Sequence, residues 1–140
     1  MTRIIRNMLG VTFIVDAIIA VGFGLYSWLF PQDTFGTIMS IPKMGSSAFV
    51  AILASLSLFY IVIGLTCLIG SKAEFPTSIW IGLLMLFRHV LEGGMKILDL
   101  GKEWFIGNPY PDIIIHSVFV LAYSLAVYFT YKNTIKVQKY

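Results

Sequence analysis

Four long apolar segments take up most of this chain and limit what it can fold into. They cover residues 8–30, 48–69, 76–98 and 111–131, and each has about the 20 residues with which a helix crosses the hydrocarbon core of a bilayer. The sequence is 58% hydrophobic and only 12% charged, whereas about a quarter of the residues in a soluble domain are charged. The sequence therefore predicts one all-α domain over residues 1–140, an integral membrane four-helix bundle in which each segment is a span.

The basic residues predict how this bundle sits in the membrane. Six of them fall on one side of the predicted spans and three on the other: Arg3, Arg6, Lys72, Lys132, Lys136 and Lys139 against Lys43, Lys96 and Lys102. Because lysine and arginine are enriched in cytoplasmic loops, both termini are expected to be cytoplasmic, with outer loops over 31–47 and 99–110. The apolar residues of 31–47 are consistent with a short helix in the outer interface or with an ordinary loop. We thus expect a multi-pass protein of a bacterial inner (plasma) membrane.

The third segment carries charges that a membrane helix normally lacks. In the stretch LFRHVLEGGMK, Arg88, Glu92 and Lys96 are four residues apart, and together with Asp99 they fall within an arc of about 80° on a helix. His89 lies at the side of that arc, about 100° from Arg88. Charged side chains within a span face the interior of a bundle rather than lipid, so this stripe is expected to point inward.

Ionisable residues in two other segments have depths that suit this stripe. At about 1.5 Å of rise per residue, Arg88 lies about 15 Å and Glu92 about 9 Å from the outer end of the span. The same count puts Asp16 in the first segment at about 20 Å and His116 in the fourth at about 8 Å. These depths predict the pairs Arg88–Asp16 and Glu92–His116, and a polar network between the first, third and fourth spans. The alternative is a ladder within the third helix, because its charged neighbours are three or four residues apart and can satisfy one another.

An inward polar cluster is compatible with several functions. The first interpretation is a non-enzymatic protein that binds a small ligand or serves a larger membrane complex as an accessory subunit. Its ligand-binding residues would be Asp16, Arg88, His89, Glu92 and His116. A histidine level with a carboxylate can exchange protons, and Arg88 could hold an anionic or quinone-like group. The alternative is a proton-coupled small transporter or a redox protein that binds quinone or haem b, for which His89 and His116 are the candidate ligands.

Other chemistries have less support in the sequence. Asp16, Glu92 and His116 are metal-ligand residue types, but they lack a diagnostic spacing such as H-E-x-x-H, so no metal and no cofactor are expected. The lone Cys67 lies inside an apolar run and reads as a small buried hydrophobe. No serine or cysteine stands in a nucleophile motif, and no catalytic residue is expected. The net charge of +3 comes without a stripe of basic and aromatic residues, which excludes nucleic acid as a partner.

Small residues in the first two segments predict close helix contacts. They are Ala20 and Gly24 in the first segment and Ala48, Ala51, Ser55 and Gly64 in the second. Such residues let membrane helices approach without lipid between them. Packing within the chain is the preferred explanation, and contact with a second copy in a homo-oligomer is the other.

The second half of the chain resembles a known type of membrane protein. The stretches LEGGMKILDLGKEW and DIIIHSVFVLAYSLAVYF resemble the third and fourth spans of small bacterial BphX-like and DoxX-like membrane proteins. In those proteins an acidic residue and a glycine precede an aspartate, a loop follows, and an Ile-His pair opens the last helix. The matching residues are Glu92, Gly93, Asp99, Gly101, Ile115 and His116. The resemblance implies a four-helix membrane fold and no particular activity.

Overall fold

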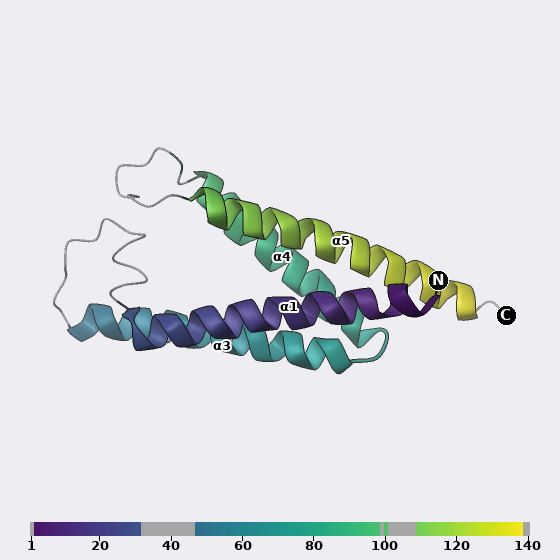
Figure 1. The fold of residues 1–140 in the computed structure, drawn as a ribbon, viewed down its shortest axis with the longest axis horizontal. Helices are drawn as coiled ribbons and strands as arrows, with labels where there is room; N and C mark the ends of the chain where they lie inside the picture. The colour runs from purple at the N-terminus through teal and green to yellow at the C-terminus, as the bar shows by residue number, and fades with distance from the viewer. Residues whose placement is uncertain (1, 32–46, 99, 101–108, 139–140) are drawn as a thin grey trace.

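The computed structural model describes residues 2–31, 47–98, 100 and 109–138. Over these ranges it contains four helices (Figure 1): α1 (Thr2–Leu29), α3 (Ser47–Lys72), α4 (Thr77–Leu98) and α5 (Tyr110–Gln138). The prediction of an all-α chain is confirmed for these residues, and each helix coincides with one of the four apolar segments. The predicted short helix or loop over 31–47 and most of the loop over 99–110 lie outside the described residues.

Three of these helices are long and apolar enough to cross a membrane. The apolar stretches are Met8–Leu29, Ala54–Lys72 and Tyr110–Ile135, with mean hydropathies of 2.2, 1.9 and 1.9. Helix α4 is not among the three, because its charged residues lower its mean hydropathy. The length and composition of α1, α3 and α5 are those of a membrane protein.

Two helix starts follow from simple backbone chemistry. Helix α4 begins at Thr77, directly after Pro76, and the carbonyl of Pro76 accepts hydrogen bonds from the N–H groups of Ile79 and Trp80. Proline is tolerated here because the first N–H groups of a helix have no partner within it. Asp112 lies in the first turn of α5, where a negative charge is favoured by the helix dipole.

The helices are arranged as two antiparallel pairs. In Figure 1, α1 lies along α3 and α4 lies along α5, and the two pairs meet near the chain termini and diverge toward the other end. Gly24 and Gly64 allow α1 and α3 to approach closely. A Cβ atom at Gly24 would lie 2.8 Å from the carbonyl oxygen of Ser57, and one at Gly64 would lie 3.0 Å from that of Ala17. These two glycines therefore serve packing within the chain.

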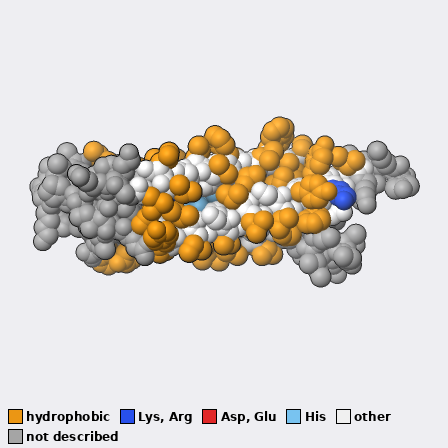
Figure 2. Space-filling model, turned by 90° about the horizontal axis from the view of Figure 1, so that it is seen from above, with side chains coloured by type: hydrophobic (Ala, Val, Ile, Leu, Met, Phe, Trp, Pro, Cys, Tyr) orange, Lys and Arg blue, Asp and Glu red, His pale blue; other side chains and the backbone are white. Residues whose placement is uncertain are grey.

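The surface is apolar and the polar side chains lie inside. Ile18, Trp80 and Leu98 are 67%, 69% and 73% exposed, and apolar side chains spread over the face seen in Figure 2. Asp16 and His89, by contrast, are each 1% exposed. An apolar exterior around buried charge is the arrangement expected of helices surrounded by lipid.

Candidate functional site

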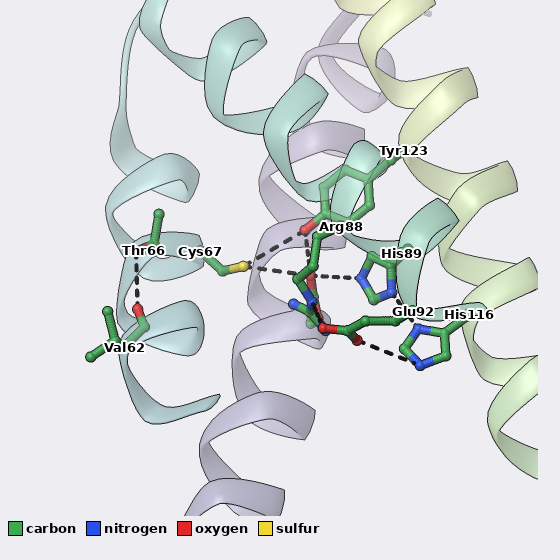
Figure 3. A network of polar contacts seen from close by, with 9 residues as sticks. Val62, Thr66, Cys67, Arg88, His89, Glu92, His116 and Tyr123 are labelled. Carbon is green, nitrogen blue, oxygen red and sulfur yellow. Dashed lines mark hydrogen bonds and ion pairs between the residues drawn. The ribbon is translucent and has the colours of Figure 1, made fainter. Parts of the chain in front are cut away.

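The polar cluster is organised around the carboxylate of Asp16, near the middle of α1. The Tyr123 hydroxyl donates a hydrogen bond to Oδ2 of Asp16 at 2.9 Å, and Nε2 of His89 lies 3.1 Å from the same oxygen. The thiol of Cys67 points at Oδ2 from 3.5 Å, while Oδ1 faces Nη1 of Arg88 at 3.4 Å. Figure 3 shows these four partners converging from α3, α4 and α5. A single buried carboxylate thus links all four helices.

Arg88 joins this carboxylate to a second one. Its Nε donates to Oε1 of Glu92 at 3.1 Å, one turn further along α4, while its Nη1 faces Asp16. The guanidinium is only 14% exposed. A buried charge of this kind is tolerated when it is paired and hydrogen-bonded, and Arg88 is paired on both sides.

Two histidines continue the cluster from α4 to α5. Nδ1 of His89 lies 2.9 Å from Nδ1 of His116, and Nε2 of His116 lies 3.5 Å from Oε2 of Glu92. Asp16, His89, His116 and Glu92 therefore form a continuous row of polar contacts. Oε2 of Glu92 is buried and accepts no hydrogen bond from the described residues.

Neighbouring residues fix the positions of the two rings. The His89 ring stacks on Phe119, with ring centroids 4.6 Å apart and planes within 9° of parallel. Gly93 leaves room for His116, because a Cβ atom there would lie 3.1 Å from the Cβ of His116. Stacking restricts rotation of one ring, and the missing side chain lets α5 bring the other ring against α4.

A cavity of about 290 Å³ opens beside this cluster. Its wall combines seven ionisable residues with Tyr60 and apolar side chains. The ionisable residues are Asp16, Arg88, His89, Glu92, Lys96, Asp112 and His116. The volumes of ligand pockets in proteins range upward from about 300 Å³. The cavity lies at the lower end of that range, so its size suits a small molecule.

The structure brings all five predicted site residues together. The Arg88–Asp16 pair and the Glu92–His116 contact both occur, as predicted. Part of the alternative ladder is present as well, because Arg88 also binds Glu92 on its own helix. His89, expected at the side of the charged stripe, instead lies at the centre of the cluster.

Other residues differ from the sequence expectation or were not anticipated by it. Lys96 forms an ion pair with Asp112 of α5, with Nζ 3.4 Å from Oδ2, and Asp99, its expected partner, lies outside the described residues. Tyr123 could have been found, because it lies two helical turns beyond His116 and so on the same face of α5. Cys67 is buried, as expected, but its thiol points at a carboxylate. The spacing of residues within α3 does not predict that contact.

The two candidate haem ligands meet in direct contact. Axial imidazole nitrogens on opposite sides of an iron, each about 2 Å from it, are about 4 Å apart. The Nδ1 atoms of His89 and His116 are 2.9 Å apart, and Nε2 of His89 faces Asp16. The two rings therefore touch each other directly, and haem binding stays a prediction.

The fold and the cluster together define a class: a protein that is all-helical over the described residues, with helices long and apolar enough to span a membrane around a buried polar cluster. Comparisons with models of protein families, with curated proteins and with solved structures find no match to this chain. The candidate function is therefore argued from the cavity itself.

Proposed function

We propose that this chain is a non-enzymatic, multi-pass membrane protein that binds a small polar or cationic molecule in the cavity between its four helices. The observation that carries the proposal is Oε2 of Glu92, a buried carboxylate oxygen at the cavity wall that accepts no hydrogen bond from the described residues. Leaving such an acceptor unsatisfied costs about 1–3 kcal/mol, and more when it is charged. Nε2 of His116 lies 3.5 Å from this oxygen, an ion-pair contact and not a hydrogen bond, so a donor or cation bound in the cavity would satisfy it.

The charges of the wall favour a cation or a hydrogen-bond donor as ligand. Two basic residues, Arg88 and Lys96, face three carboxylates, Asp16, Glu92 and Asp112. The guanidinium of Arg88 is already bound by two of them. An anionic or quinone-like headgroup would have to compete with those carboxylates, so we do not assign one.

The proposal includes the place of the protein in the cell. We place it in a bacterial inner membrane with α4 as a fourth span and both termini in the cytoplasm. The excess of lysine and arginine on that side supports this orientation. In Figure 1 the start of α1 and the end of α5 lie together, on the same side as the turn between α3 and α4. Four crossings return a chain to the side on which it began, and this arrangement agrees with that.

Native mass spectrometry of the protein released directly from membranes tests the binding function. We expect the wild type to carry a bound small species in addition to lipid. Glu92→Gln and His116→Ala should lose it, with affinity falling at least about tenfold, because both remove groups from the cavity wall. Ser117→Ala is the matched control, since Ser117 is exposed and bonds only the carbonyl of Ile113 among the described residues. Identical bound masses in all four proteins would overturn the proposal.

The same sample decides between this function and an accessory role. A protein that serves a larger complex should copurify with other subunits in mild detergent. We expect the chain to elute free of them, because the polar contacts of the described residues are directed into its own cavity. Stoichiometric copurification of a partner, with an empty cavity in the mass spectrum, would favour the accessory role instead.

An absorption spectrum checks the haem alternative. We expect the purified wild type to show no Soret band, because the contact between His89 and His116 leaves no space for a porphyrin. The control is the same preparation after incubation with haemin and desalting. A Soret band that survives desalting in the wild type and disappears in His116→Ala would contradict this expectation.

A further inference from the structure

The two histidines and Glu92 stand close enough together to bind a metal ion. One ligand atom from each of His89, Glu92 and His116 can be chosen so that all three lie within 4.8 Å of one another. His89 and Glu92 are three residues apart on α4 and share a helix face, and His116 reaches them from α5. All three residues line the cavity.

The contacts of His89 show which of its nitrogens is free to bind. A neutral imidazole has one N–H and one bare nitrogen. Nε2 faces a carboxylate oxygen of Asp16 at 3.1 Å, which can only accept, so Nε2 carries the hydrogen. Nδ1 is then bare and points at Nδ1 of His116, 2.9 Å away.

The contacts of His116 lead to a conflict that a cation resolves. If its Nε2 carries the hydrogen toward Glu92, the two bare Nδ1 atoms face each other at 2.9 Å and repel. If its Nδ1 carries the hydrogen instead, a bare Nε2 faces the carboxylate of Glu92. In either case Oε2 of Glu92, 3.5 Å from Nε2 of His116, accepts no hydrogen bond from the described residues, and a bound cation would satisfy it. The two carboxylates exceed the single charge of Arg88, which also favours an added cation.

We propose that His89, Glu92 and His116 bind a divalent transition-metal ion of the zinc type, with Asp16 orienting His89. Two imidazoles and one carboxylate are a known zinc ligand set that leaves a further position for water or a ligand. Imidazole selects transition metals over Ca²⁺ and Mg²⁺, which prefer oxygen. Two nitrogens that share one tetrahedral ion, each about 2.0–2.1 Å from it, lie roughly 3.3–3.4 Å apart, so the two Nδ1 atoms, 2.9 Å apart here, would separate by about 0.5 Å on binding.

The environment of His89 supports the same assignment. Metal-bound histidines usually donate their other N–H to a carboxylate, which fixes the ring and makes it a stronger ligand. Asp16 stands in that position, and it is itself held by Tyr123 and Arg88. The inference rests on the proposed function, since the ion would be the cationic species that the cavity binds.

Zinc binding by the purified full-length protein tests the assignment. The protein is stripped with a chelator, loaded with Zn²⁺ and desalted, and zinc per chain is measured by mass spectrometry of the elements. Affinity is measured by competition with a chromophoric chelator. We expect about one zinc per chain in the wild type, loss of zinc in His116→Ala, and at least about tenfold weaker binding in Glu92→Gln. Asp16→Asn should weaken binding about 10–100-fold.

Glu74→Gln is the matched control, because it makes the same chemical change as Glu92→Gln at an exposed residue that does not line the cavity. It should bind zinc like the wild type. If His116→Ala does not fold, the near-isosteric Glu92→Gln decides, and the d–d absorption of bound Co²⁺ gives a second readout. A wild type that keeps no zinc after desalting, or equal affinity in Glu92→Gln and Glu74→Gln, would overturn the metal site. If native mass spectrometry detects a bound organic molecule but the protein binds no zinc, the metal site is overturned and the proposed function stands. If neither an organic molecule nor zinc is bound, the metal site and the proposed function are both rejected.

Discussion

Replacing Asp16 with alanine is expected to destabilise the bundle by about 3–5 kcal/mol, the usual cost of removing one partner of a buried ion pair. The carboxylate is 1% exposed and contacts Arg88, His89, Tyr123 and Cys67. Without it, a guanidinium and a hydroxyl are left without their buried acceptor, and the link between the helices is lost. Unfolding by steric trapping in bicelles measures the change in free energy.

The Lys96–Asp112 pair provides the control for this prediction. The side chain of Asp112 is 40% exposed, and exposed ion pairs contribute about 0–1 kcal/mol. Asp112→Ala should therefore change the free energy of unfolding little. Asp16→Asn should fall between the two, because its amide oxygen still accepts a hydrogen bond from Tyr123 but carries no charge. Equal losses in Asp16→Ala and Asp112→Ala would show that the cluster does not hold the bundle together.

Replacing Gly24 with alanine is expected to destabilise the contact between α1 and α3 by about 1–3 kcal/mol. The added Cβ would lie 2.8 Å from the carbonyl oxygen of Ser57 and 2.8 Å from a side-chain carbon of Ile61. The carbonyl belongs to the backbone of α3, so it cannot move aside without moving the helix. Thermal unfolding followed by size-exclusion chromatography in detergent should show a lower midpoint.

Gly22→Ala is the control on the same helix. A Cβ atom at Gly22 would meet nothing within 4 Å, so no contact is lost. Alanine also favours a helix over glycine by as much as about 1 kcal/mol. The midpoint of Gly22→Ala should therefore stay the same or rise. A similar fall in both variants would mean that the effect comes from glycine in α1 generally and not from the contact with α3.

The sequence alone was sufficient for the helices and for the inward position of Asp16, Arg88 and Glu92. Apolar segments of membrane-spanning length can form only a few structures, because every backbone group must be hydrogen-bonded within the segment itself. Charges within such a segment are driven away from lipid. The pair Arg88–Asp16 followed from depth alone, because counting residues from the outer end of each predicted span puts the two side chains at similar depths.

The tertiary structure decided how the cluster is connected. Which side of α4 meets α5 depends on packing: Gly93 lets His116 approach, and Phe119 stacks on His89. These contacts move His89 from the edge of a predicted stripe to the centre of the cluster. Depth along a helix can be counted from the sequence, but rotation about its axis and the closeness of neighbouring helices depend on side chains far away in the chain. The contact between the two histidines, on which the proposed metal site depends, is for that reason visible only in the folded structure.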